Sequence, residues 1–387
     1  MKPLDLTAHF SRFLAVPGRI HLAAHSHHFW PDVTREAQLL AWDDACRHAD
    51  EKWEPLFAEV IPAVQRAIAA VLGLPAPQSI AFAPNTHDFV RRLLSTLPER
   101  PRILTTDGEF HSFARQVARL EEEGLIQVER VPHEPVTSFA ERLRAAAARG
   151  GHHMVFVSHV IFNAGCTSGD IAALAAAVPD RGTLIVIDGY HGFMALPTDL
   201  SAVAGRVFYI AGGYKYAMGG ENVCFMHCPP GYGERPRDTG WFAAFGALAG
   251  RQQGVPYGPD GNRFWGATFD PIGFYRLRAV FSWLEGLGLR VQDIHDHVLA
   301  LQEHFLACVA ARRIGALQVA RLVTPMETRQ RGHFLTFETP EAGALYERLL
   351  ARRIVTDVRG DRIRFGFGLY HTALSVEQAA DAISAAL

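Results

Sequence analysis

Short apolar segments alternate with amphipathic helical segments through the middle of this 387-residue chain, and this alternation constrains the fold more than any other feature. Apolar runs occur at residues 80–84, 102–106, 154–160 and 184–188, and each is followed by a turn or by a stretch with helical spacing. Repeated strand–helix units build a mostly parallel sheet with right-handed crossovers. The sequence therefore predicts an α/β fold.

The segments on either side of this region have different patterns. Residues 34–72 have the spacing of helices, whereas residues 229–273 are rich in glycine and proline and indicate long functional loops. The C-terminal part mixes short strands with helices. We predict a large α/β domain at residues 55–265 and a smaller α+β domain formed by residues 1–54 and 266–387.

The composition excludes several classes of protein. Apolar residues make up 49% and charged residues 20%, which is typical of a globular chain. The net charge of −2 predicts no nucleic-acid partner. Five cysteines without a CxxC pair favour free thiols in a reducing cytoplasm. The first 20 residues lack a signal peptide, and no 18-residue apolar run occurs, so we expect no membrane association.

Lysine is rare in this sequence. Of 38 basic residues, the three lysines are Lys2, Lys52 and Lys215. Lys215 follows an apolar strand and lies between two glycine pairs in AGGYKYAMGGEN, residues 211–222. A desolvated lysine has a lowered pKa, and its neutral amine can condense with an aldehyde, which an arginine cannot do. The alternative is a solvated lysine at the tip of a glycine-rich turn.

Asp188 ends the apolar run TLIVID, at the strand edge where open α/β sheets bind ligands. A carboxylate there can pair with a protonated pyridine nitrogen, the interaction that lets pyridoxal phosphate act as an electron sink. The 27 residues from Asp188 to Lys215 cover one further strand and place both groups at one sheet edge. The alternative is an aspartate that caps a helix or a turn.

Two further segments follow predicted strands. Asn85, Thr86 and His87 stand at the start of a helix expected to begin near Asp88, where free N–H groups favour phosphate, although plain helix capping is the alternative. Phe110 follows the next strand and could stack on a flat ring, or belong to the core.

Arg364 lies in the alternating segment DRIRFGFGLYHT. Alternation would place Arg362 and Arg364 on one face, where Arg364 could clamp a carboxylate; two solvated edge-strand arginines are the alternative. Histidines 25, 27 and 28 invite a metal interpretation, but no acid or cysteine at ligand spacing completes a site, so we expect no metal.

In this order, these segments resemble an enzyme dependent on pyridoxal 5'-phosphate with the aspartate-aminotransferase fold (fold type I), class V branch, and most of all kynureninase. GYKYAMGG (residues 213–220) is similar to the family's SYKYLNAGxG, and DGYH (188–191) is similar to its DLAH. RIRFGFGLYHT (362–372) resembles IRVAPxPLYNS, and IHLAAHSHHFWP (20–31) resembles YLDGNSLGPxP. The resemblance covers nearly the whole chain.

The resemblance implies a cofactor site. Lys215 would form the Schiff base with pyridoxal phosphate and then act as acid and base at Cα. Asp188 would pair with the pyridine nitrogen, with His191 near it. Tyr214 would contact the phosphate and relay a proton, and Phe110 would stack on the ring. The phosphate would also be bound at Asn85, Thr86 and His87.

The resemblance also implies a substrate site and a partner. Arg364 would hold the α-carboxylate of a small amino acid substrate, with Ser26 close by. Trp241 and Thr268 would reach the site, Thr268 from this or from a second subunit. A homodimer with its active site at the interface is expected.

The sequence departs from the family on the substrate side. The family's NSLG is His25-Ser26-His27-His28 here, and its SN pair is Thr268-Phe269, so an amide that would contact an aryl ketone is missing. A family arginine is replaced by Asn163. Phe269 and Asn163 therefore belong to the expected substrate pocket, but they leave the substrate open.

Kynureninase-like hydrolysis of a Cβ–Cγ bond, giving alanine and an aromatic acid, is the function that the resemblance implies. A class V aminotransferase, an epimerase or a carbon–sulfur lyase on another amino acid is the alternative, and a non-catalytic binding protein with this fold is a second one. Cysteine desulfurase is disfavoured because Cys308 lies in an apolar helical stretch.

Overall fold

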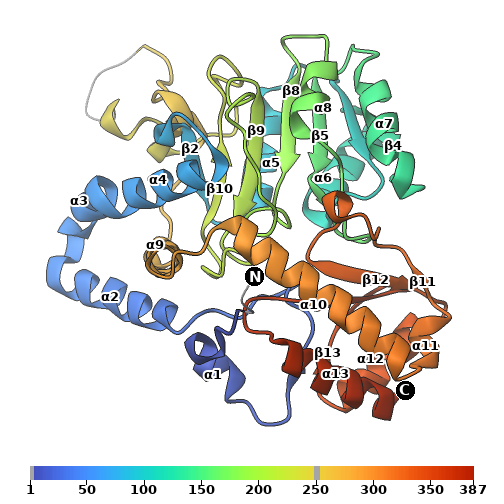
Figure 1. The fold of residues 1–387 in the computed structure, drawn as a ribbon. Helices are drawn as coiled ribbons and strands as arrows, with labels where there is room; N and C mark the ends of the chain where they lie inside the picture. Colours follow the sequence, from blue (N-terminus) through green and yellow to red (C-terminus); the bar gives the residue numbers. More distant parts are fainter. Residues whose placement is uncertain (1–3, 248–252) are drawn as a thin grey trace.

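The computed structural model describes residues 4–247 and 253–387, so Lys2 lies outside the described residues. Within them, a seven-stranded sheet has the order β2-β10-β9-β8-β5-β3-β4 (Figure 1). Strand β10 runs antiparallel to both of its neighbours, and the other strands run parallel to one another. The predicted α/β fold with a large, mostly parallel sheet is confirmed. The strands are β2 (Ile80–Ala83), β3 (Arg102–Thr106), β4 (Gln127–Val131), β5 (Met154–Ser158), β8 (Leu184–Asp188), β9 (Val207–Gly212) and β10 (Cys224–His227).

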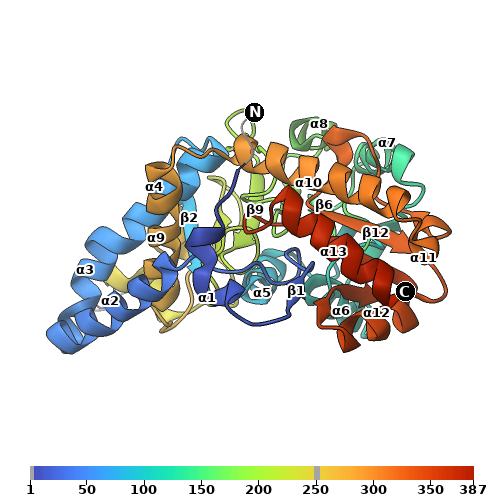
Figure 2. The ribbon, with the colours of Figure 1, turned by 60° about the horizontal axis from the view of Figure 1, so that its bottom comes forward.

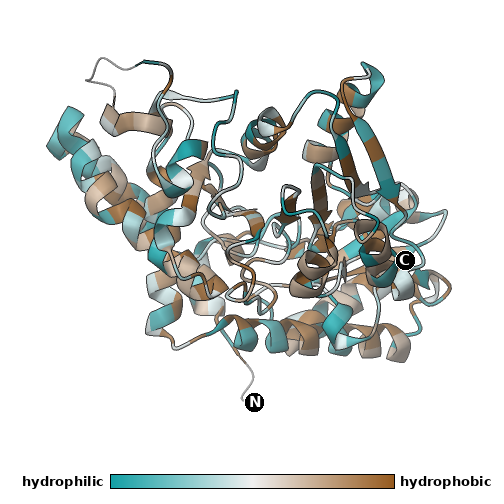
Figure 3. Cartoon of the chain, turned by 90° about the horizontal axis from the view of Figure 1, so that it is seen from above, coloured by the Kyte–Doolittle hydropathy of each residue, from teal (hydrophilic) through white to brown (hydrophobic). Residues whose placement is uncertain are grey.

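The strands of this sheet are apolar because helices cover the sheet and exclude water from it. All residues of β2, β5, β9 and β10 are buried. In Figure 3 the central strands are brown, while the helices around them mix brown with teal. The connecting helices are α5 (Thr86–Thr96), α6 (His111–Glu122), α7 (Val136–Ala147) and α8 (Ile171–Ala177).

A second, antiparallel sheet of order β11-β12-β15-β14 lies in the C-terminal part, with helices packed on it (Figures 1 and 2). Ile363 and Phe365 of β15 are fully buried in its separate core, as the alternation around Arg364 predicts. A short parallel pair, β1 with β13, ties residues 20–21 to this part. Its elements are β1 (Ile20–His21), α10 (Val291–Ala311), α11 (Gly315–Gln318), β11 (Arg321–Leu322), β12 (Phe334–Glu338), α12 (Ala342–Ala351), β13 (Ile354–Val355), β14 (Asp357–Arg359), β15 (Arg362–Gly366) and α13 (Ala373–Ala386).

The helices of the N-terminal segment belong to the main hydrophobic core, around the large sheet, rather than to the core of the small sheet. Phe10 and Ala37 belong to the main core, as does Phe274 of α9 (Ile272–Gly286), which lies along α2 (Val33–His48) and α4 (Ile61–Leu72). The division at residues 55–265 stays a prediction, but the packing places α9 with the large sheet.

The helical run Val33–Leu72 is, among the described residues, the one stretch long and apolar enough to cross a membrane by length and composition alone. Core helices pass the same test. Val60, Val64 and Ile68 of this run are buried in the main core, so packing accounts for part of its apolar character.

Candidate active site

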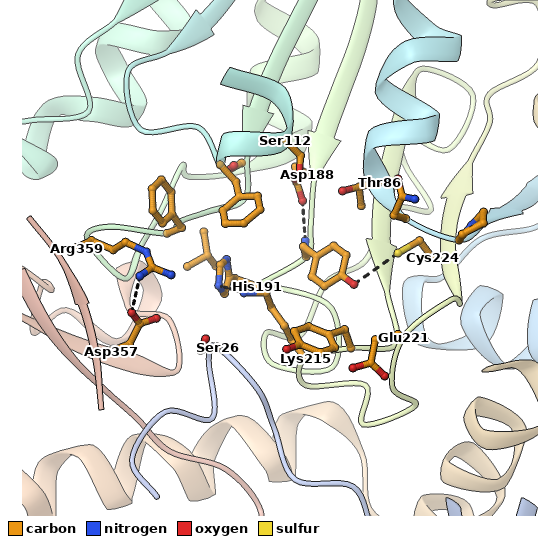
Figure 4. Close-up of a pocket in the computed structure, with 18 of the residues that line it drawn as sticks. Ser26, Thr86, Ser112, Asp188, His191, Lys215, Glu221, Cys224, Asp357 and Arg359 are labelled. Carbon is orange, nitrogen blue, oxygen red and sulfur yellow. Dashed lines mark hydrogen bonds and ion pairs between the residues drawn. The ribbon is translucent and has the colours of Figure 1, made fainter. Parts of the chain in front are cut away.

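A cavity of about 520 Å³ lies at the edge where the parallel strands of the large sheet end. Residues of the loops after β2, β3, β8 and β9 line it, together with the last residues of β5 and β8 and the first residue of β10. Side chains of the small domain and Ser26 of the N-terminal segment form the opposite wall (Figure 4). This is the position where open α/β sheets bind ligands, and the volume is typical of a small-molecule site.

Lys215 is presented to this cavity by a closed loop after β9. Gly219 N–H donates to the carbonyl of Gly213 at 2.8 Å, and Gly220 has a left-handed φ of +75°. A Cβ on Gly220 would lie 2.9 Å from the Trp30 ring, so this turn requires glycine. The prediction of a tight glycine loop is therefore consistent with the structure.

The amine of Lys215 has two polar partners. Lys215 Nζ donates to the carbonyl of His25 at 2.9 Å and lies 2.7 Å from His191 Nε2. Burial, and next the positive charge of Arg364, lower the pKa of Lys215 to about 7. The amine can therefore lose its proton near neutral pH, as nucleophilic attack on an aldehyde requires.

Asp188 ends β8, the strand next to the one that leads to Lys215. Its Oδ1 accepts a hydrogen bond from Tyr190 N–H at 2.9 Å, which leaves the second oxygen for a ligand (Figure 4). Burial raises the pKa of Asp188 to about 6. A cationic N–H placed against this carboxylate would offset that effect.

The start of α5 lies at the end of the cavity away from Asp357 and Arg359 (Figure 4). The helix begins at Thr86, two residues before the predicted position, because Asn85 caps it: Asn85 Oδ1 accepts from Asp88 N–H at 3.0 Å. Asn85 and Thr86 line the cavity, and the free N–H groups of this first turn suit a phosphate. Phe110 also lines the cavity and is 37% exposed, so it is not a core residue.

Arg364 projects from the small domain into the same cavity and is almost fully buried. Its guanidinium donates to Asp357 and to the carbonyl of Phe162, and its Nε has no partner. Asp357 also pairs with Arg359 at 2.9 Å (Figure 4). The predicted solvated alternative for Arg364 does not occur, and the arginine can exchange these contacts for a ligand carboxylate.

The structure brings together nine of the fourteen predicted site residues in this cavity. They are Ser26, Asn85, Thr86, Phe110, Asp188, His191, Tyr214, Lys215 and Arg364. His191 Nε2 lies 2.7 Å from Lys215 Nζ, and His191 lines the same cavity as Asp188. Tyr214 is half-buried, and burial raises the pKa of its hydroxyl.

The other five predicted residues lie outside the main cavity of this chain. His87 Nε2 lies 3.2 Å from Gln116 Oε1, and Trp241 is 43% exposed beside Phe242. Thr268 and Phe269 line a smaller cavity. The ring of Phe269 packs there in a cluster of aromatic side chains that includes Phe57 and Trp265. Asn163 is held in the turn after Phe162, where its carbonyl accepts from Arg362.

Several cavity residues were not predicted from the sequence. Asp357 and Arg359 lie in TDVRGD, where nothing in the local pattern distinguishes them from a charged turn. Glu109 does not line the cavity but contacts one of its lining residues: it is buried and accepts from Ser158 Oγ at 2.6 Å, and also from Thr106 Oγ1 at 2.7 Å. Burial raises its pKa to about 7. The sequence feature that could have identified Glu109 is its position directly before Phe110, after a predicted strand.

Within the part of the chain that the structure describes, no cluster of three histidine, cysteine, aspartate or glutamate side chains is placed to hold a metal ion. His25 is fully buried, stacks on Phe334, and has no hydrogen-bond partner on either ring nitrogen.

These residues fit pyridoxal phosphate: an amine with a lowered pKa, a carboxylate on the adjacent strand, a helix start with free N–H groups and an accessible aromatic ring.

The chain matches several solved protein structures over nearly all its length. The complex of the cystine C–S lyase C-DES with cysteine persulfide superimposes with a TM-score of 0.81 at 17% identity, over 96% of this chain and 98% of that one. The apo cysteine desulfurase of Thermococcus onnurineus NA1 gives 0.73 at 15% identity, over 95% and 94%. A variant of C-DES contains glycine covalently linked to its pyridoxal phosphate cofactor.

Fold and site together define the class: this is the fold type I architecture of the pyridoxal-phosphate-dependent enzymes, as the sequence predicts. Within that class the chain is similar to kynureninase. Residues 294–383 match the family model of the kynureninase C-terminal domain. Kynureninase of Pseudomonas fluorescens is 30% identical over 230 residues, and that of Burkholderia mallei (strain SAVP1) is 31% identical over 230 residues; each match covers 57% of this chain. The chain spans about half the length of these relatives, 53% and 52%.

Proposed function

We propose that this protein is a pyridoxal-phosphate-dependent enzyme that hydrolyses the Cβ–Cγ bond of an amino acid with a γ-carbonyl group, of the kynurenine kind. The observation that carries the cofactor is the placement of Lys215 and Asp188 on adjacent strand ends of one cavity. The similarity to kynureninase supports the reaction. When bound, the cofactor supplies an electron sink for negative charge at Cα.

The residues of this chain have distinct tasks in that reaction. Arg364 binds the α-carboxylate, for which it must exchange its contact with Asp357. Lys215, with its lowered pKa, removes the proton at Cα. Water then adds its oxygen to Cγ, and the Cβ–Cγ bond breaks. Cβ takes a proton that comes from the water, by way of Tyr214, which lines the cavity. Lys215 finally returns a proton to Cα, which completes alanine. The products are alanine and a carboxylic acid.

A carbon–sulfur lyase is the second candidate. It is favoured because Phe269 and Asn163, which replace family residues expected on the substrate side, do not line the main cavity of this chain. A desulfurase that uses a cysteine nucleophile is not favoured. Cys224 lines the cavity, but burial raises the pKa of its thiol to about 12, and Cys308 is buried in α10.

We further propose a cytoplasmic homodimer with the active site at its interface. The segments of Trp241 and Thr268 run together, since Phe242 N–H donates to the carbonyl of Gly266 at 3.0 Å. Trp241 and Phe245 are 43% and 52% exposed in this single chain. Exposed aromatic side chains of this kind are typical of a surface that a second subunit covers. Sedimentation should give a dimer; a fully active monomer would contradict this proposal.

A product analysis tests the reaction. The purified protein, loaded with pyridoxal phosphate, is incubated separately with kynurenine, 3-hydroxykynurenine, cysteine and aspartate. Alanine and an aromatic acid in equal amounts from either kynurenine are the expected products. Sulfide from cysteine would favour the second candidate, and transfer of the amino group alone would indicate an aminotransferase. A loaded protein that turns over none of the substrates would support a binding protein.

A further inference from the structure

A second cavity, of about 170 Å³, adjoins the phosphate end of the main one. The two cavities share Pro84 and Asn222 in their walls. The second cavity is bounded by α5, by the loop of residues 265–269 and by Phe82 and Phe274. Its volume corresponds to about six waters at the density of the liquid. It is therefore large enough for a small ion and too small for a second amino acid substrate and cofactor.

Arg92 of α5 lines this cavity and is only 8% exposed. Its Nε and Nη1 have no hydrogen-bond partner. Asp88 forms a long ion pair with Arg92, with its Oδ2 3.8 Å from Arg92 Nη2 and therefore beyond hydrogen-bond distance, and Asp238 also acts on the charge of Arg92. Gly266 allows the guanidinium to lie directly against the loop backbone, since a Cβ there would collide with it. A buried guanidinium with free N–H groups is unfavourable unless an acceptor occupies the cavity.

Trp265 provides a second unpaired donor in the same wall. It is 4% exposed, and its indole Nε1 has no partner. Thr268 and Asn222 also line the cavity, so two residues with neutral donors supplement one buried cation. Asp88 is the one acid in this lining and makes no hydrogen bond with Arg92, so the Nε and Nη1 donors of Arg92 stay available to a ligand.

We propose that this cavity is a binding site for a small oxyanion, either a carboxylate or a tetrahedral inorganic anion, held by Arg92 and Trp265. A guanidinium recognises both kinds through paired N–H donors. The site is separate from the phosphate site at Thr86, because Arg92 lies well within α5, whereas Thr86 is the first residue of that helix. The inference does not depend on the reaction proposed above.

Anion titrations of the loaded protein test this site, because the bound cofactor then occupies the phosphate site of the main cavity. Sulfate and acetate are titrated separately by calorimetry, so that an inorganic anion and a carboxylate are distinguished. Arg92→Gln should weaken binding of the preferred anion by about tenfold or more. Trp265→Phe, which removes the indole N–H together with part of the ring, should weaken it by a few fold. Arg91→Gln is the matched control, since Arg91 is an exposed neighbour on α5 paired with Asp238.

Crystals of the unmodified protein soaked in selenate provide a test that does not require a variant to fold. An anomalous selenium peak within hydrogen-bond distance of Arg92 is the expected result. Equal anion affinity of the wild type and Arg92→Gln would overturn the proposal. So would ordered water alone, or a side chain of a second subunit, on the Arg92 guanidinium.

Discussion

The two walls of the main cavity are built from different kinds of structure. The wall expected to hold the cofactor consists of strand ends of one sheet, with Asp188, Lys215 and Thr86 fixed by the register of neighbouring strands. The opposite wall combines the β14–β15 hairpin of the small domain with a turn that contains Ser26. The first wall is set by regular hydrogen bonding, whereas the second depends on how separate parts of the chain pack. We therefore expect substitutions in the two walls to have separable effects on cofactor and on substrate.

The largest effect is expected for Lys215→Ala in the cofactor wall. Loss of the amine removes both the covalent attachment and the acid/base group, so activity should fall by about 10³-fold or more. The visible absorbance of the lysine-linked cofactor should disappear as well. Lys52→Ala, on the N-terminal helices, is the control and should retain both. Full activity in Lys215→Ala would contradict the assignment of this wall to the cofactor.

Arg364→Gln should separate the substrate wall from the cofactor wall. Loss of a charge-assisted carboxylate contact should lower kcat/KM by about 10- to 100-fold, mainly through KM, with the cofactor retained. Steady-state kinetics and the absorbance of the same samples measure both quantities. Arg362→Gln, on the same strand but outside the cavity, should leave KM unchanged. Cofactor loss in Arg364→Gln would mean that the two walls are not separable.

The pH dependence of cofactor capture tests the electrostatic link between the walls. Because the pKa of Lys215 is lowered to about 7, capture of pyridoxal phosphate by the apoprotein should accelerate as the pH rises through 7 and level off above it. Arg364 is the second largest cause of that lowering, so Arg364→Gln raises the pKa and should move the curve to higher pH. Stopped-flow absorbance measures the rate; an unshifted curve would show that burial alone sets the pKa.

Glu109→Gln should have the smallest effect, on stability more than on rate. The pKa of Glu109 is raised from 4.5 to about 7, so the folded protein binds the proton more tightly than the unfolded chain. In the wild type the free energy of unfolding should therefore decrease as the pH rises from 4.5 to about 7, by up to about 1.4 kcal/mol per pH unit. Glu109→Gln should flatten this slope in chemical denaturation of the apoprotein, and the exposed Glu122→Gln should not. Equal slopes in all three proteins would contradict a buried, protonated Glu109.

The comparison of the two walls also explains what the sequence could predict. Asp188 and Lys215 follow apolar runs, and because parallel strands end at one edge, their proximity follows from the pattern alone. Thr86 was placed correctly at a helix start, with the boundary two residues late because Asn85 acts as the cap.

The substrate wall could not be predicted in the same way. Asp357 lies directly opposite Arg364 in the register of β14 with β15, and local composition does not determine that register. Phe269 was expected near a substrate, but its ring packs against Trp265 and Phe57, which is a tertiary contact without a sequence signature. Assigning Phe269 a contact in the main cavity requires a second subunit, and this remains a prediction.

Chemical trapping of the cofactor tests the central assignment most directly, because the chain contains only three lysines. Borohydride reduction of the loaded protein fixes the cofactor to the amine that holds it, and peptide mass spectrometry then identifies that lysine. We predict that the peptide containing Lys215 carries the pyridoxyl phosphate group and that the Lys2 and Lys52 peptides are unmodified. Label on Lys52, or no label on any lysine, would contradict the account.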